Sequence, residues 1–163
     1  IKAKGLFSRA NARQYYQSQL ISTISTTYSV GGSISTRPLG CLSADYSIDY
    51  DANRLSMDDN DASWLGSLVN RMNISVFPMN KLRWDISGEH YHNEISDGLY
   101  KNVLMLDTKV TYTLNKRIEL SASLSNILDK RTYNYTTYSQ TAAFESQRNL
   151  RGRELLLTIT LTK

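Results

Sequence analysis

The amino-acid sequence predicts an all-β fold: an antiparallel up-and-down transmembrane β-barrel segment of about eight strands, with short periplasmic turns and long extracellular loops. Three observations predict it. Apolar and polar residues alternate with a period of two over long stretches, helix signals are almost absent, and short turns alternate with longer polar connections. The 163 residues have a mean hydropathy of -0.41, and no apolar run approaches the roughly 20 residues of a membrane-spanning helix.

The clearest strand runs from Cys41 to Ala52. Its even positions from Leu42 onward are apolar, whereas its odd positions are Cys, Ser and Asp. A helix would distribute these residues around its circumference, so the alternation indicates a strand with two different faces. The same alternation, with a partial strand at the start of the chain, predicts strands over residues 1–7, 20–34, 41–52, 68–78, 82–88, 102–114, 118–128 and 154–162.

The connections between these strands differ in length. Three short turns, which contain both prolines of the chain, lie at Ser35–Cys41, Pro78–Asn80 and Asn115–Lys116. The other connections are longer and polar, and they cover Ser8–Gln19, Ser56–Ser63, Asn93–Leu99 and Asn134–Arg148. Short turns at one end of the strands and long loops at the other are typical of outer-membrane barrels.

The two faces of the strands from residue 20 onward differ in charge. The apolar faces carry no charged residue, whereas the opposite faces carry both signs among many Ser and Thr. A charge that faces lipid costs roughly 2–4 kcal/mol near the bilayer midplane, so a membrane would enforce this difference. A sandwich core would enforce it too, but sandwich strands are usually about 5–6 residues long. The polar face predicts lumen-lining residues at Asp45, Asp49, Arg83, Asp107, Lys109 and Glu119.

Aromatic residues gather near the predicted long loops. Tyr and Trp collect at membrane interfaces because one end of each ring is apolar and the other is polar, so these residues predict an aromatic girdle. The alternative is that Tyr is simply a good strand residue. The loop aromatics predicted to bind substrate are Trp64, Tyr91, Tyr100 and Tyr135.

Two C-terminal segments carry a recognisable pattern. Leu120–Tyr133 is an alternating strand that runs into Asn-Ile-Leu-Asp-Lys-Arg at Asn126–Arg131 and then a Tyr, and Leu150–Leu157 begins Leu-Arg-Gly-Arg-Glu. With Ser75–Pro78, these segments resemble the penultimate strand, the last strand and a periplasmic turn of TonB-dependent outer-membrane receptors, chiefly the Bacteroidetes-type members. A Pro often stands in that family where Gly152 stands here.

The resemblance covers residues 68–163 well and implies a function. Such receptors are barrels of roughly 22 strands, filled by an N-terminal plug domain, that import scarce nutrients with energy from TonB. Residues 1–163 would be the C-terminal portion of the barrel, with the plug domain and the N-terminal barrel strands outside it. The implied cargo is a glycan, a peptide or a metal chelate. The implied partners are the rest of the barrel and plug, TonB acting indirectly through the plug, a surface substrate-binding lipoprotein, and outer-membrane lipid.

Two other classes of protein fit the alternation. One is a small autonomous outer-membrane barrel, because eight strands can close a ring that their own side chains fill. Its odd-face charges would have to pair inside a narrow lumen. The other is a soluble, secreted β-sandwich that binds carbohydrate through its aromatic residues, which predicts a shared dry core and folding without detergent.

The remaining patterns argue against other functions. We expect no enzymatic activity and no cofactor, because no nucleophile motif or phosphate-binding glycine loop occurs. His90 and His92 are two residues apart at the loop end of a predicted strand, and residues 58–61 are rich in Asp, but neither set completes a metal site, so none is predicted. The net charge of +4 is scattered and indicates no nucleic-acid partner.

Overall fold

The chain forms one long antiparallel sheet. The structure is a computed structural model that describes residues 1–163 except 17–18, 58–59, 62–63, 97, 139–142 and 163. Its strands are β1 (Lys2–Tyr16), β2 (Gln19–Leu39), β3 (Leu42–Met57), β4 (Asn60–Asp61), β5 (Leu65–Met79), β6 (Leu82–Ser96), β7 (Leu99–Asn115), β8 (Ile118–Ser125), β9 (Thr132–Tyr138), β10 (Ala143–Asn149) and β11 (Glu154–Leu161).

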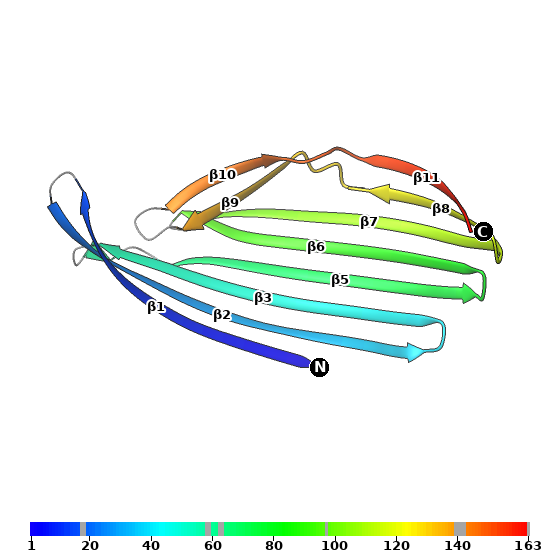
Figure 1. Ribbon diagram of the computed structural model, residues 1–163, viewed down its shortest axis with the longest axis horizontal. Helices are drawn as coiled ribbons and strands as arrows, with labels where there is room; N and C mark the ends of the chain where they lie inside the picture. The colour runs from blue at the N-terminus through cyan, green and yellow to red at the C-terminus, as the bar shows by residue number, and fades with distance from the viewer. Residues whose placement is uncertain (17–18, 58–59, 62–63, 97, 139–142, 163) are drawn as a thin grey trace.

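Strands of the sheet pair with the next strand along the chain, except that β5 follows β3 and β11 follows β8. The order is β1-β2-β3-β5-β6-β7-β8-β11, with the short β4 beside β3, and β9 and β10 form a separate pair. The predicted up-and-down sheet of about eight strands is therefore confirmed. The described residues do not close it into a barrel, because β1 and β11 lie at opposite edges (Figure 1). Among these residues there is no helix of the length and hydropathy needed to cross a membrane.

The register sorts the side chains onto two faces. Successive side chains of a strand point to opposite sides, so residues opposite each other across the sheet share one face. One row of such residues in β2, β3, β5, β6 and β7 reads Ile34, Tyr46, Met72, Gly88 and Leu106. The adjacent row in the same strands reads Ser35, Asp45, Asn73, Ser87 and Asp107. We call these sides the apolar face and the polar face.

Very few hydrophobic side chains are buried. Among the described residues the buried ones are Ala52, Leu55, Ile95 and Val103. By contrast, Leu157 and Ile159 on the apolar face of β11 are 72% and 69% exposed, and a long series of other large apolar residues is exposed as well. A soluble domain is stabilised mainly by burying such side chains. The sheet is one layer thick over most of its length, so its apolar face has no core to join.

The predicted long connections are wrong, because the strands continue through most of them. Strand β1 runs to Tyr16, opposite Gln19 of β2, although the prediction ended it at residue 7. Strands β6 and β7 pair as far as Ser96 and Leu99, and β9 and β10 occupy most of residues 134–148. Backbone pairing needs no hydrophobic side chain, and these outer parts of the hairpins lack the alternation on which the prediction depended.

The short turns occur where the sequence predicts them. Strands β2 and β3 are joined at residues 40–41, β5 and β6 at 80–81, and β7 and β8 at 116–117. The prolines, however, lie at the ends of strands rather than in the turns themselves. Pro38 and Pro78 each fall within a shift of strand register beside a turn. A bulge tolerates proline, because it leaves one residue without a ladder hydrogen bond.

Strand β8 ends at Ser125, three residues before the predicted end at 128. Asn126 has a φ of 50°, in the left-handed region where Asn is the commonest residue after Gly. Its amide nitrogen Nδ2 donates to the carbonyl oxygens of Lys130 (2.8 Å) and Arg151 (2.7 Å), and its Oδ1 accepts from the Lys130 N–H (2.9 Å). One side chain therefore joins two segments that are far apart in the sequence.

We call these two segments, residues 126–131 and 150–153, the buckle. Asp129 accepts a hydrogen bond from the Arg153 N–H (3.0 Å), and the Leu150 N–H donates to the Arg131 carbonyl (2.9 Å). The Arg131 guanidinium lies against Gly152 so closely that a Cβ at this position would collide with it. The buckle interrupts one long hairpin, with β8 and β11 on one side of it and β9 and β10 on the other (Figure 1).

Replacing Asn126 tests the buckle. Asn126→Ala removes three hydrogen bonds and places a Cβ at a positive φ, so we expect the free energy of unfolding to fall by about 3 kcal/mol. Asn126→Gly removes the same hydrogen bonds without the backbone cost and should lose about 1 kcal/mol less. Denaturant titration followed by circular dichroism measures both. Wild-type stability in Asn126→Ala would contradict this role.

Candidate functional site

The six predicted lumen-lining residues all lie on the polar face. Arg83, Lys109 and Glu119 line a hollow of about 380 Å³ near the short turns. Asp107 lines another of about 370 Å³, between the sheet and the buckle, and the Asp107 carboxylate accepts a hydrogen bond from the Asn126 N–H (2.6 Å). Asp45 lines a third hollow, also of about 370 Å³, at the start of β1.

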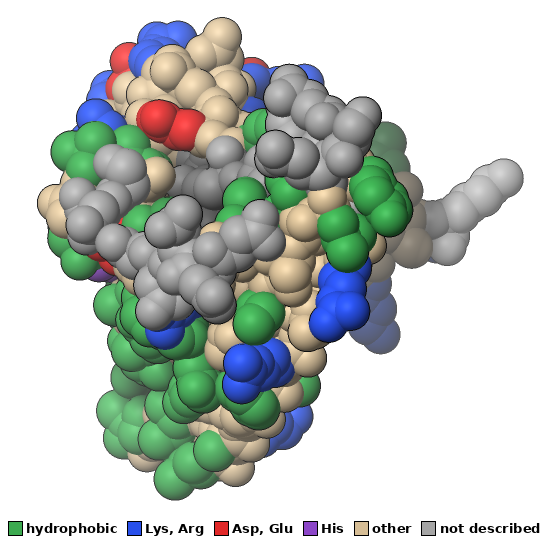
Figure 2. Space-filling view, turned by 90° about the vertical axis from the view of Figure 1, so that its left-hand side faces the viewer, with side chains coloured by type: hydrophobic (Ala, Val, Ile, Leu, Met, Phe, Trp, Pro, Cys, Tyr) green, Lys and Arg blue, Asp and Glu red, His purple; other side chains and the backbone are tan. Residues whose placement is uncertain are grey.

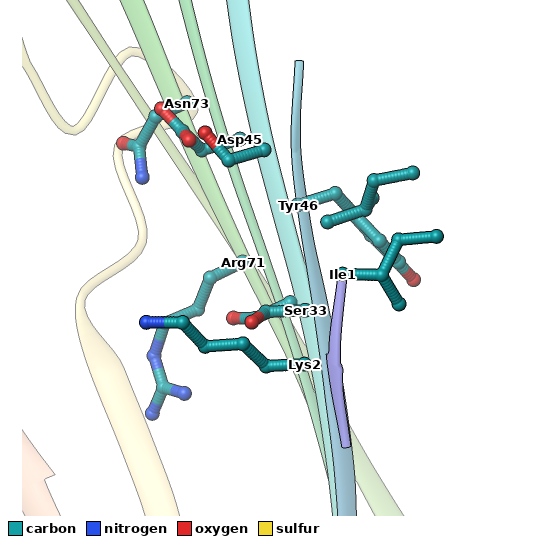
Figure 3. Close-up of a pocket in the computed structure, with 10 residues that line it drawn as sticks. Ile1, Lys2, Ser33, Asp45, Tyr46, Arg71 and Asn73 are labelled. Atoms are coloured by element: carbon teal, nitrogen blue, oxygen red, sulfur yellow. The ribbon is translucent and has the colours of Figure 1, made fainter.

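The third hollow shows how the two faces separate. Lys2, Asp45, Arg71 and Asn73 extend to one side of the strands, whereas Tyr46 extends to the other (Figure 3). The hollow lies at the corner of the sheet where pairing between β1 and β2 begins, at Lys2 and Ser33. It is an opening at the edge of the sheet rather than an enclosed pocket.

The sixth predicted residue, Asp49, is the centre of a row of ion pairs across the sheet. Its Oδ1 lies 2.8 Å from Lys4 Nζ of β1, and its Oδ2 lies 3.0 Å from Arg71 Nη1 of β5. Arg71 Nε in turn lies 3.9 Å from Glu89 Oε1 of β6. We call Lys4, Asp49, Arg71 and Glu89 the charge ladder. It alternates in sign across four strands, so it leaves little net charge on this part of the face.

Gly31 allows the charge ladder to reach β1. It lies between Lys4 and Asp49 in the register, on the strand that separates them. A Cβ at this position would collide with the Asp49 carboxylate and would lie 2.6 Å from the Lys4 Cε atom. A glycine in the middle of a long strand often marks such a close approach. Here two charged side chains meet over the bare backbone of β2.

The charge ladder continues into a polar cluster at the long-hairpin end. The Tyr91 hydroxyl donates to Glu89 Oε2 (2.6 Å), and the Tyr91 ring meets the Tyr133 ring edge-on at 4.9 Å. Asn93, which is 4% exposed, donates from Nδ2 to the Tyr133 hydroxyl (3.3 Å) and to the Asn134 carbonyl (3.1 Å). These contacts hold β9 against β6, so the β9–β10 hairpin leans over the polar face.

This arrangement presents hydrogen-bond donors and acceptors along one continuous surface. Toward the short turns, Arg83 Nε lies 2.8 Å from Asp85 Oδ1, and Ser75 donates to the same oxygen (2.6 Å). Most of these charges are partly exposed and already paired with one another. Such a surface suits contact with water or with another polar surface.

The sequence predicted the polar-face position of Asp49 and Arg71 but missed Lys4 and Glu89, and so missed the charge ladder as a unit. Arg71 falls on the polar side of a correctly predicted strand, and Glu89 falls one residue beyond the predicted end of another. Lys4 belongs to the strand that was predicted only in part. The signal that could have found the ladder is Gly31, a glycine within a clear alternating strand, but its meaning depends on the register of β1 and β3.

The predicted substrate-binding aromatics are not brought together. Tyr91 lies on the polar face, in the cluster with Tyr133. Trp64 packs on Tyr28, and Tyr100 stacks on His92 at 4.8 Å, and these two pairs belong to the apolar face near the long-hairpin end. The backbone of Tyr135 is part of β9, but its side chain lies outside the described residues.

The two histidines take part in polar pairs on the apolar face. His90 Nδ1 lies 3.3 Å from Asn70 Nδ2, and His92 Nδ1 lies 2.6 Å from Asn102 Oδ1. Within the part of the chain that the structure describes, no group of three or more His, Cys, Asp or Glu side chains could hold a metal ion. Asp58 and Asp59 of the acidic segment lie outside the described residues.

Comparison of the chain with models of protein families, with curated proteins and with solved structures found no match. The resemblance to TonB-dependent receptors therefore remains an expectation from the motifs. The sheet and its two faces are the observations on which a functional proposal can rest.

Replacing Gly31 tests whether this glycine allows Lys4 to pair with Asp49. A double-mutant cycle with Lys4→Met and Asp49→Asn should give a coupling free energy of about 0.2–1 kcal/mol, as for other exposed pairs. In a Gly31→Ala background the coupling should vanish, because the new methyl group separates the two side chains. Gly32→Ala is the matched control, since a Cβ there meets only the Lys2 carbonyl at 3.6 Å. Equal coupling in both backgrounds would refute the role of Gly31.

Proposed function

We propose that this chain forms part of the wall of an outer-membrane transport barrel. Its apolar face would contact lipid, and its polar face would line the lumen through which a nutrient is imported. The observation that carries the proposal is the combination of unusually long strands with an exposed apolar face and a charged opposite face. Ordinary soluble strands are about 5–6 residues long, whereas β2 has 21 residues and β7 has 17.

The dimensions of the strands support this proposal. At about 3.3 Å per residue, a strand of 15 residues such as β5 is roughly 50 Å long, and a tilted strand of about 9–11 residues crosses the hydrocarbon core. The strands would therefore extend well beyond the membrane at the long-hairpin end. Polar side chains can occupy both faces outside the lipid, which accounts for the loss of alternation there.

The unpaired edges favour a larger assembly. A small autonomous barrel would need β1 to pair with β11, and the described residues of these two strands pair only with β2 and β8. A soluble sandwich would need a second sheet against the apolar face, where Tyr46, Ile48 and Leu104 are each about two-fifths exposed. The proposed partners are consequently further barrel strands at both edges, with a plug inside the polar face.

The buckle supports the resemblance to TonB-dependent receptors. The two segments that carry the resemblance, at Asn126–Arg131 and Leu150–Leu157, are the ones that Asn126 and Asp129 join through hydrogen bonds. The proposed cargo remains a nutrient such as a glycan, a peptide or a metal chelate. TonB would act through the plug, and a surface lipoprotein would act at the long-hairpin end.

Adjacent residues on opposite faces test the contact with lipid. Ile74→Arg places a charge on the apolar face and should destabilise the membrane-inserted form by about 2–4 kcal/mol, whereas Asn73→Arg, one residue earlier on the polar face, should be tolerated. Refolding yield with and without detergent measures both. Cooperative folding of the wild-type chain as a soluble monomer in plain buffer would overturn the proposal.

The single cysteine tests the orientation. Cys41 is exposed in the short turn between β2 and β3, which the proposal places in the periplasm. A polymer-linked maleimide too large for outer-membrane pores should leave it unlabelled in intact cells and label it after the membrane is permeabilised.

Leu99→Cys in a Cys41→Ser background is the control, because Leu99 is 50% exposed at the long-hairpin end. It should react in intact cells. The reverse labelling pattern would show that the orientation is inverted.

A further inference from the structure

A small hollow lies on the apolar face at the long-hairpin end of β1, β2 and β3. Its volume is about 250 Å³, and it is lined by Phe7, Arg9, Ile24, Thr26, Tyr28, Arg54, Ser56 and Trp64. Seen from this end, the molecule presents Lys and Arg side chains close to hydrophobic ones (Figure 2). Two of the described residues that line the hollow are arginines.

The register places the two arginines on either side of Thr26. Arg9 of β1 and Arg54 of β3 both lie opposite Thr26 of β2. Neighbouring strands are about 4.8 Å apart, so the two arginine backbones are separated by roughly 10 Å, with a hydroxyl group between them. Guanidinium groups bind phosphate through paired, charge-assisted hydrogen bonds, and a threonine hydroxyl can donate one more.

Aromatic rings border the arginines on the side of the short turns. The Phe7 ring lies 4.9 Å from the Tyr28 ring, and Tyr28 lies 5.2 Å from Trp64. The Arg54 guanidinium lies 5.8 Å from the centre of the Trp64 ring, within the range of a cation–π contact. Apolar rings are thus directly beside cationic groups.

This row is where charge begins on the apolar face. Between it and the short turns, the apolar positions of β1, β2 and β3 carry no charged residue, from Ile1 to Phe7, from Tyr28 to Ile34 and from Leu42 to Ala52. A face that changes from apolar through aromatic to cationic matches the order of acyl chain, interface and headgroup in a bilayer.

We propose that Arg9 and Arg54 bind the phosphate of an anionic lipid headgroup, with the acyl chains lying over Phe7, Tyr28 and Trp64. The inference rests on the proposed membrane location and adds to it a specific lipid site outside the lumen. A lipid phosphate is proposed rather than free phosphate, because the hollow is continuous with the face proposed to contact acyl chains.

Native mass spectrometry of the full chain tests this site. The chain is extracted in neutral detergent, in the assembly that it forms, from membranes of cells that produce it, and is titrated with phosphatidic acid. We expect one saturable lipid adduct. Arg9→Gln and Arg54→Gln should each raise the half-saturating concentration about fivefold. Arg13→Gln is the matched control, because Arg13 lies four residues after Arg9 on the same face of β1. It should change the half-saturating concentration less than twofold.

Two further ligands test whether the acyl chain and the phosphate are both needed for binding. Oleate supplies acyl chain and negative charge without phosphate, and inorganic phosphate supplies the anion without acyl chain. If oleate or inorganic phosphate saturates the site at the concentration at which phosphatidic acid does, the lipid-phosphate assignment is overturned. It is also overturned if Arg9→Gln and Arg13→Gln weaken phosphatidic acid binding equally. Recovery of the wild-type chain only in the soluble fraction would instead overturn the membrane proposal, and this inference with it. Membrane recovery without an arginine-dependent adduct would overturn the lipid site alone.

Discussion

The backbone ladder between neighbouring strands determines nearly everything else in this structure. A sheet one layer thick has little core to hold side chains in place, so the pairing of each strand with the next decides which residues share a face. A shift of one residue between β3 and β5 would place Asp45 beside Ile74 and Tyr46 beside Asn73. Separation of the apolar face from the polar face therefore depends on correct register over seven strand pairs.

Irregularities in the ladder occur beside the short turns and within the C-terminal hairpin. At the short turns, the bulges at Pro38 and Pro78 accommodate residues that cannot donate to the ladder. In the C-terminal hairpin, the strands cannot pair continuously, because six residues on one side face four on the other. The Asn126 side chain closes that gap through hydrogen bonds to both segments of the buckle. The same junction brings the Asn126 N–H to the Asp107 carboxylate on the polar face. It also directs the β9–β10 hairpin over that face, where the Asn134 carbonyl accepts a hydrogen bond from Asn93.

The sequence was sufficient to predict those strands whose two faces differ in hydrophobicity or charge. The strand at residues 41–52 could be predicted because every second residue is apolar, and the assignment of Asp45, Asp49 and Lys109 to one face followed from that period. The outer half of β1 could not be predicted, since residues 8–16 carry polar side chains on both faces. The charge ladder could not be predicted either. Its members come from four strands, and only the register shows that Gly31 lets Lys4 meet Asp49.

The edge strands β1 and β11 have a consequence for how the sheet assembles. All eight residues of β11 are exposed, and one side of its backbone, like one side of β1, is unpaired in the described structure. An edge of this kind accepts any compatible strand, including the edge of an identical molecule, and so invites polymerisation. In the proposed barrel wall, both edges would have to be shielded until further strands cover them. The order in which the two edges are covered would then decide between productive assembly and aggregation.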